Sequence, residues 1–183
     1  MDEKLRNKID QYIDFLAQNA SPPKDEDIPN TTFEHAYQGV SFLIDNAMKY
    51  DGEDNEIKII SNQFYEDFWI RLIDEFKKYL EKNGKLSIIL LKYINNNAVL
   101  QRLSMLYPDK IDIYFANKID KSKLELIPNF TLIKPYGYRI ELSDKEMENK
   151  IVTAYINFGN LEKSENLSKF FTLLMSKSEK KKF

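Results

Sequence analysis

The chain has 183 residues, enough for one domain with a short extension, and its 43% hydrophobic and 13% aromatic content supports a packed core. Its 27 basic and 29 acidic residues give a formal net charge of −2, which excludes a strong general attraction to nucleic acid or to an anionic membrane. The absence of cysteine excludes disulfides, zinc–thiolate sites and thiol nucleophiles, and it is consistent with a reducing compartment.

The first 30 residues predict a helix followed by a linker. Residues 19–30, NASPPKDEDIPN, hold three prolines and a charge cluster, which is typical of a surface loop. The charged N-terminus is unlike a signal peptide, and no run approaches the roughly 20 apolar residues of a membrane span, so we expect a cytoplasmic protein. The helix is predicted from apolar residues at steps of three and four: Leu5, Ile9, Tyr12, Ile13 and Leu16.

From residue 31 to residue 176 the pattern predicts an α/β domain, and 177–183 are expected to be a basic tail. Predicted helices cover about 32–50, 64–82, 96–106 and 164–175. Predicted strands cover 57–61, 86–91, 111–115, about 130–142 and 150–157. Continuous apolar strands that alternate with helices predict a mixed, mainly parallel sheet with helices on both faces. The last two strands are expected to form an antiparallel hairpin.

Several familiar site types are excluded. Residues 43–61 resemble the helix of histidine-kinase-type ATPases in which Asn46 would hold a nucleotide's metal, but the glycine-rich motifs of those proteins are missing. Phosphate-binding loops and serine-hydrolase elbows are missing as well. The single histidine, His35, near the start of a helix, is interpreted as a surface or capping residue. We therefore expect no metal and no cofactor.

The segment PYGYRIELSD (135–144) holds the most informative spacing. Gly137, Arg139 and Asp144 fall at positions one, three and eight of a frame, and AYINF follows with Asn157 and Phe158. This arrangement resembles the phospholipase D-like superfamily, whose signature is H-x-K-x4-D on a hairpin followed by a G-S-x-N-F-like segment. The order of predicted elements agrees over about residues 32–175.

The resemblance implies what each position would do. In that family the histidine attacks phosphorus, the lysine stabilises the phosphoryl oxygens and the aspartate supports the histidine. Here Gly137 removes the nucleophile, Arg139 keeps a cation for phosphate, and Asp144 and Asn157 keep polar groups. The resemblance thus implies an anion-binding site without bond-breaking chemistry. Family sites use two motif copies, so it also implies a homodimer or a partner protein.

Two aromatic groupings leave alternatives open. Tyr136 and Tyr138 beside Lys134 and Arg139 would suit stacking and phosphate contact with single-stranded nucleic acid, or they pack beneath the last helix. Strand alternation puts both tyrosines on the face opposite Arg139. On helix 64–82, several large apolar side chains are either buried by the sheet or form a partner surface: Tyr65, Trp69 and Ile73.

The leading hypothesis is a catalytically inactive phospholipase D-like module that binds or assembles within a larger complex. Its ligand would carry phosphate, as a nucleic acid or nucleotide does, with Arg139, Asp144, Asn157, Lys134, Tyr136 and Tyr138 as candidate binding residues. An active phosphodiesterase or nuclease with an atypical nucleophile is the second hypothesis. A purely protein-interacting domain is the third.

Overall fold

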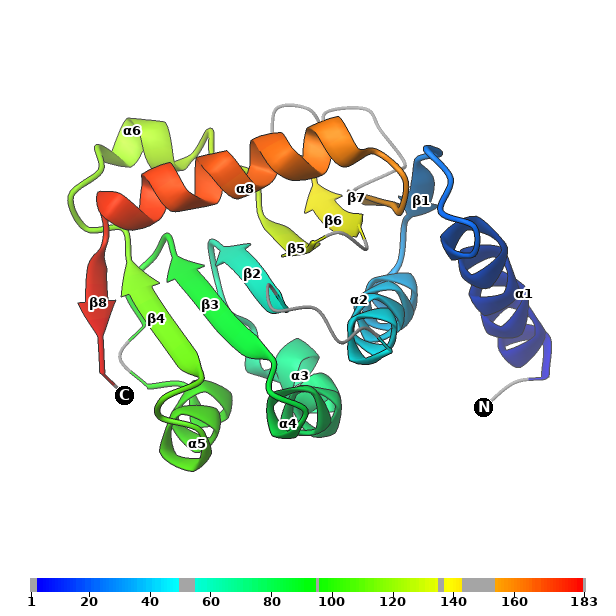
Figure 1. The fold of residues 1–183 in the computed structure, drawn as a ribbon, viewed down its shortest axis with the longest axis horizontal. Helices are drawn as coiled ribbons and strands as arrows, with labels where there is room; N and C mark the ends of the chain where they lie inside the picture. Colours follow the sequence, from blue (N-terminus) through cyan, green and yellow to red (C-terminus); the bar gives the residue numbers. More distant parts are fainter. Residues whose placement is uncertain (1–2, 50–54, 95, 135–136, 143–153, 183) are drawn as a thin grey trace.

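The computed structural model describes residues 3–49, 55–94, 96–134, 137–142 and 154–182. Within these residues the apolar runs form one sheet between two helical layers (Figure 1). The strands are β1 (Ile28–Asn30), β2 (Glu56–Ser61), β3 (Lys85–Leu90), β4 (Ile111–Phe115), β5 (Phe130–Ile133), β6 (Gly137–Glu141), β7 (Ala154–Asn157) and β8 (Glu179–Lys181). Across the sheet their order is β1-β7-β6-β5-β2-β3-β4-β8.

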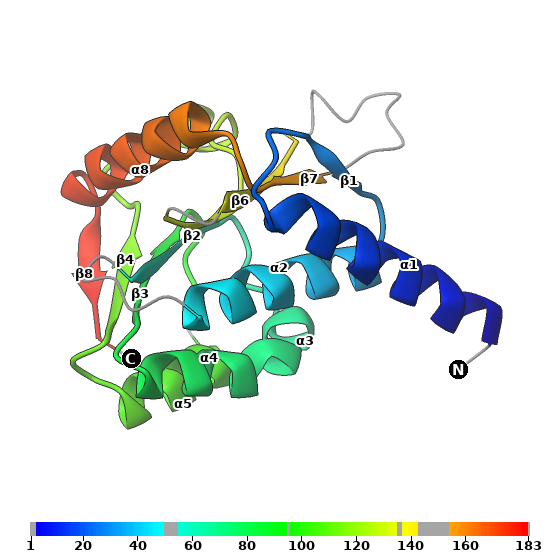
Figure 2. The ribbon, with the colours of Figure 1, turned by 45° about the vertical axis from the view of Figure 1, so that its right-hand side comes forward.

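Helices cover both faces of the sheet, and each face has its own apolar core (Figures 1 and 2). The helices are α1 (Glu3–Ala20), α2 (Phe33–Met48), α3 (Glu66–Trp69), α4 (Ile73–Glu81), α5 (Ala98–Leu106), α6 (Lys121–Leu124) and α8 (Leu161–Ser176). The core on the α2 face also contains residues of α4 and α5, whereas the opposite core is closed by α8. No helix among the described residues is long and apolar enough to cross a membrane.

The prediction of a mainly parallel sheet is wrong. Only β2–β3 and β3–β4 pair in parallel, and the other five described pairings are antiparallel. The strands are apolar because helices cover both faces, and burial of this kind leaves no trace of strand direction in the sequence. The run 130–142, predicted as one strand, holds two strands, β5 and β6, which pair antiparallel with each other. The predicted antiparallel pairing with the following strand is confirmed for β6 and β7.

The chain ends contribute to the sheet. Residues 28–30, placed in the predicted linker, form edge strand β1, which pairs antiparallel with β7. Residues 179–181, placed in the predicted tail, form edge strand β8, which pairs antiparallel with β4. All three predicted parts, the extension, the domain and the tail, contribute strands to the sheet. The division of the chain at these boundaries stays a prediction.

The predicted helix 64–82 is divided into α3, a 3-10 turn (Ile70–Leu72) and α4. Trp69 and Ile73 are each only 7% exposed and belong to the core on the α2 face. Tyr65, which precedes α3, is 65% exposed. The core therefore takes two of the three side chains that were candidates for a partner surface, and Tyr65 alone stays at the surface.

Candidate functional site

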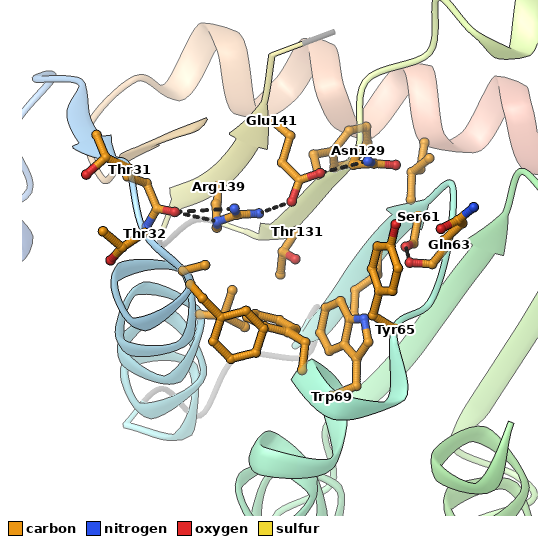
Figure 3. Close-up of a pocket in the computed structure, with 18 residues that line it drawn as sticks. Thr31, Thr32, Ser61, Gln63, Tyr65, Trp69, Asn129, Thr131, Arg139 and Glu141 are labelled. Atoms are coloured by element: carbon orange, nitrogen blue, oxygen red, sulfur yellow. Dashed lines mark hydrogen bonds and ion pairs between the residues drawn. The ribbon is translucent and has the colours of Figure 1, made fainter. Parts of the chain in front are cut away.

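A cavity of about 320 Å³ lies on the α2 face of the sheet, at the carboxyl end of β2 (Figure 3). There β2 runs parallel to β3 on one side and antiparallel to β5 on the other. Open α/β sheets bind ligands at such points, beyond the strand ends where the topology switches. The lining is polar at Asn30, Thr31, Thr32, Ser61, Gln63, Asn129, Thr131, Arg139 and Glu141, and apolar or aromatic at Phe33, Ala36, Val40, Ile59, Ile60, Tyr65, Phe68, Trp69 and Phe130.

Arg139 enters the cavity from β6. It pairs across the strands with Thr131 of β5, so both side chains lie on the α2 face. Arg139 is only 9% exposed, and its Nε and Nη2 each donate to Asn30 Oδ1 at 3.3 Å. Its Nη1 donates to Glu141 Oε1 at 2.7 Å. The guanidinium N–H groups that would bind a phosphate are therefore already hydrogen-bonded to neighbouring side chains.

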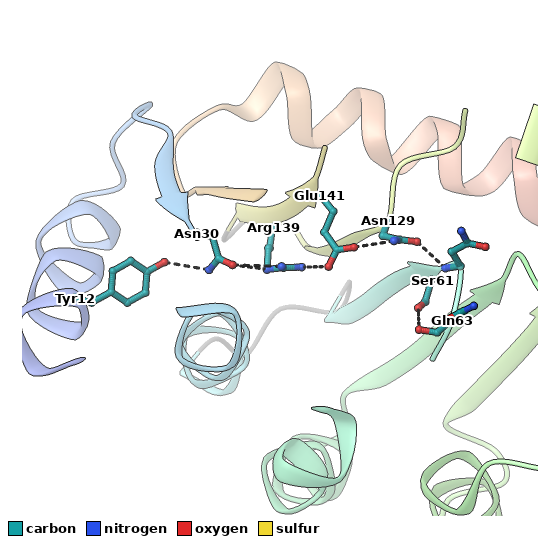
Figure 4. Close-up of polar contacts among 8 residues, drawn as sticks. Tyr12, Asn30, Ser61, Gln63, Asn129, Arg139 and Glu141 are labelled. Atoms are coloured by element: carbon teal, nitrogen blue, oxygen red, sulfur yellow. Dashed lines mark hydrogen bonds and ion pairs between the residues drawn. The ribbon is translucent and has the colours of Figure 1, made fainter. Parts of the chain in front are cut away.

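A line of hydrogen bonds extends from this arginine in both directions (Figure 4). On one side, Asn30 Nδ2 donates to the Tyr12 hydroxyl of α1 at 3.2 Å. Burial raises the pKa of that hydroxyl, and the hydrogen bond with Asn30 and the positive charge of Arg139 oppose the shift. Helix α1 is thereby joined to the cavity wall through the Asn30 amide.

On the other side, Glu141 Oε2 accepts from Asn129 Nδ2 at 2.7 Å. Asn129 Oδ1 in turn accepts from the backbone N–H of Asn62 at 2.6 Å, just beyond β2. Both carboxylate oxygens of Glu141 thus have partners. The network fixes the polar groups of the cavity before a ligand enters, which lowers the ordering cost of binding.

The cavity is close to electrically neutral. Of the described residues that line it, only Arg139 and Glu141 carry a full charge at neutral pH, and they form an ion pair with each other. A phosphate at the guanidinium would face the Glu141 carboxylate at short range, where like charges repel strongly.

Gly137, the first position of the spacing that resembles the family signature, has surroundings that leave no room for a side chain. Its φ of +123° lies in the region that favours glycine. A Cβ atom there would lie 2.3 Å from the backbone oxygen of Asn157. Restoring a nucleophile at this position would require the backbone of β6 and β7 to move.

Asn157 does not share the cavity with Arg139. It pairs with Tyr138, the neighbour of Arg139, so its side chain lies on the α8 face of the sheet. Its Nδ2 donates to Asp25 Oδ1 at 2.9 Å and to Asp27 Oδ1 at 3.0 Å. Its Oδ1 accepts from the N–H groups of Gly159 and Asn160, at 3.0 and 2.8 Å. The amide thereby joins the segment before β1 to the start of α8.

Lys134 and Tyr138 also lie on the α8 side. Tyr138 is 1% exposed and packs edge-to-face with Tyr155 at a centroid distance of 6.3 Å. Burial raises the pKa of its hydroxyl. Lys134 forms an ion pair with Glu165 of α8. The structure therefore does not bring these two residues together with Arg139, while Tyr136 and Asp144 lie outside the described residues.

His35 lies in the first turn of α2, as expected, where its backbone N–H donates to the Thr32 hydroxyl. Its ring stacks on Tyr12 at 4.1 Å, and Nδ1 lies 3.4 Å from the Thr31 hydroxyl. Partial burial lowers the pKa of the imidazole, although the charge of Glu34 opposes this shift. Among the described residues no group of three or more histidine, cysteine, aspartate or glutamate side chains could hold a metal ion.

Sequence reasoning missed most of the cavity. Asn30 was assigned to a linker and Asn129 to no site, because nothing in a single sequence places them beside a residue such as Arg139. Glu141 carried a usable signal, since it follows Arg139 by two positions on a strand and so shares its face.

No family model and no curated protein matches this sequence. The strand order and helical layers define a phospholipase D-like fold. Nuc from Salmonella typhimurium, a phospholipase D family member, superposes with a TM-score of 0.52 and 8% identity, over 78% of this chain and 90% of Nuc. NucT from Helicobacter pylori gives 0.54 and 13%, over 77% of this chain and 89% of NucT.

A third similar structure is TrmBL2, an archaeal chromatin protein with a novel mode of DNA binding. It superposes with a TM-score of 0.58 and 15% identity over 97% of this chain. The chain spans 63% of the length of TrmBL2. At such low identities these similarities establish the fold, and the function has to be argued from the site.

Proposed function

We propose that this chain is a catalytically inactive phospholipase D-like module that binds a phosphate-bearing ligand, a nucleotide or a nucleic acid, in the cavity at Arg139. Gly137 is the main support for the lack of catalysis, because neither a nucleophilic side chain nor even a methyl group fits at that position. Covalent catalysis of the family type needs a nucleophilic side chain there.

The cavity supports a binding role. It has the size of a small-ligand site, and it combines aromatic side chains with uncharged polar groups and one ion pair. The network through Asn30, Glu141 and Asn129 organises these groups in advance. TrmBL2, which shares the fold, binds DNA, and this favours a nucleic acid or one of its building blocks as the ligand.

The module is further proposed to work within a larger assembly, as a homodimer or with a partner protein. The basis is the resemblance to a family whose sites combine two motif copies. Light scattering on the purified chain tests the homodimer directly, and a monomer at all concentrations leaves a different partner as the proposal.

Binding and catalysis are tested together. Trp69 lines the cavity and is the only tryptophan of the chain, so its fluorescence reports on occupancy. Titration with a short single-stranded oligonucleotide and with nucleotides should give saturable changes, while a generic phosphodiester stays unhydrolysed. Thr131→Val removes a hydroxyl from the cavity with little change in volume and should weaken binding.

Lys169→Ala is the matched control, because this exposed lysine lies on α8, on the far side of the sheet. It should bind as the wild type does. Hydrolysis that persists in purified protein would replace this proposal with an active phosphodiesterase that uses another nucleophile. The absence of any binding would favour a purely protein-interacting domain.

A further inference from the structure

We infer that the part of the ligand that enters the cavity is an uncharged nucleoside, its 2′ and 3′ sugar hydroxyls facing Glu141 and its base facing Phe33 and Tyr65, with any 5′-phosphate left outside. This inference rests on the proposed function and names which portion of a nucleotide or nucleic acid the site selects.

The charges of the cavity favour an uncharged group. The positive charge of Arg139 is already cancelled by Glu141 at 2.7 Å. A phosphate that displaced Glu141 from Nη1 would remove the arginine partner of Glu141 Oε1 and place a second negative charge beside this carboxylate. Neutral groups avoid that cost, since they can hydrogen-bond to the pair without breaking it.

The entrance is also unfavourable to phosphate. Phe33, Tyr65 and Phe68 line the cavity and also an adjoining open depression, where Glu66 and Asp67 add two carboxylates. The cation beside this surface, Arg71, lies 5.4 Å from the Phe33 ring. Its charge is already balanced, because Nη2 lies 3.0 Å from Glu34 Oε2.

The aromatic side chains offer a surface for a flat ring. Phe33 is 52% exposed and Tyr65 is 65% exposed, although both line the cavity. Bases stack favourably on such side chains whatever their sequence, because every base has a π-face. Trp69 is less available for stacking, because it is 7% exposed, stacks on Phe64 at 4.6 Å and lies at 5.8 Å from the Phe76 ring.

The polar wall of the cavity suits a sugar. Glu141, Asn129 and Thr131 lie together along it (Figure 3). A sugar hydroxyl both donates and accepts, so it can bind a carboxylate and an amide at once. A carboxylate that accepts from ribose hydroxyls is a recurrent feature of nucleotide sites in α/β proteins. A nucleoside has both the flat ring and the hydroxyl groups that these two walls require.

The experiment compares adenosine, 3′-AMP, ribose and inorganic phosphate by Trp69 fluorescence in the intact chain. Adenosine should bind at least about tenfold more tightly than 3′-AMP, a difference of about 1.4 kcal/mol, because the 3′-phosphate would place a second negative charge beside Glu141. Inorganic phosphate should not compete, and ribose should bind far more weakly than adenosine. Glu141→Gln gives the cavity a net positive charge and should shift the ratio by about tenfold towards 3′-AMP.

Each outcome decides the question. Tighter binding of 3′-AMP or phosphate to the wild type would overturn this inference and leave the proposed function standing. If ribose bound as tightly as adenosine, the base would have no role in binding. If none of the four probes binds, both the inference and the nucleotide-binding function fail. The wild-type comparison holds even if Glu141→Gln folds poorly, and thermal melting of that variant identifies such a case.

Discussion

Glu141 Oε1 lies 2.7 Å from Nη1 of Arg139, two residues earlier on the same strand, and this pair sets the charge of the cavity. The strand places both side chains on one face, and the asparagines at positions 30 and 129 hold the outer side of each partner. Arg139, which the sequence suggests as a phosphate-binding cation, is paired with Glu141 in the folded chain.

Removal of either Arg139 or Glu141 should lower the free energy of unfolding, and the two losses should not be additive. Arg139→Met should destabilise the fold by about 2–3 kcal/mol, because the side chain is 9% exposed and its removal leaves Glu141 and Asn30 short of partners. The double variant Arg139→Met/Glu141→Leu should lose less than the sum of the single losses. Urea denaturation measures all three, and additivity within about 0.5 kcal/mol would contradict the coupling.

A histidine at position 137 should destabilise the fold. Gly137→His should lower stability by about 2 kcal/mol or more, because φ is +123° and Cβ would meet the backbone of β7. Gly137→Ala should show most of the same loss, which identifies the backbone and Cβ as the cause. Thermal melting and a phosphodiesterase assay check both variants. A stable, active Gly137→His would show that this position can accept a catalytic side chain.

The Asn157 amide should be replaceable by a carboxyl only at low pH. In Asn157→Asp the new group would face Asp25 and Asp27, which now accept hydrogen bonds at 2.9 and 3.0 Å. Repulsion would raise the pKa of the new carboxyl in the folded state above its unfolded value. Its stability contribution is then present at low pH and is lost as the pH rises through the folded pKa.

We therefore expect Asn157→Asp to be about 1–2 kcal/mol less stable than the wild type at neutral pH and to regain most of this near pH 4. Asn157→Ala is the control, since it removes the same hydrogen bonds without adding a charge. Its loss relative to the wild type should change little with pH. Equal pH profiles for the two variants would argue against the contact with Asp25 and Asp27.

The sequence predicted the elements of the fold well, because long apolar periodicities survive into the structure. The expected strand 111–115 is the observed β4, and the expected helix 32–50 contains α2. Strand direction was not predictable, since β5 is as apolar as β2 but runs antiparallel to it. The connection from β4 to β5, with its short α6, reverses the chain and has no periodic signal.

The candidate site was only partly predictable, because the face on which a strand residue lies depends on the register between strands. Side chains alternate along a strand, so a one-residue change in register moves a residue to the other face. Alternation within β6 correctly separates Arg139 from Tyr138. The face of Asn157 depends on the register between β6 and β7, which a single sequence leaves open. The contact of Arg139 with Asn30 spans 109 positions and had no local signal.

The single histidine gives a clean test of the packing of α1 on α2. Burial lowers the pKa of His35 below its usual 6.5, so NMR titration should find a lower value. The unfolded chain then binds the proton more readily, and His35 should reduce stability as the pH falls from about 6.5 through its folded pKa. Tyr12→Ala uncovers the ring and should move the pKa back towards 6.5. A wild-type pKa at or above 6.5 would contradict the burial of this ring.

The cavity at Arg139 is the proposed ligand site. Amide chemical-shift mapping of the labelled chain during titration with adenosine and a short oligonucleotide locates the bound ligand. We expect shifts concentrated at 30–33, 61–69, 129–131 and 139–141, and much smaller changes in Thr131→Val at equal concentration. Shifts confined to the α8 face, around Lys58 and Lys134, or no shifts at all, would contradict it.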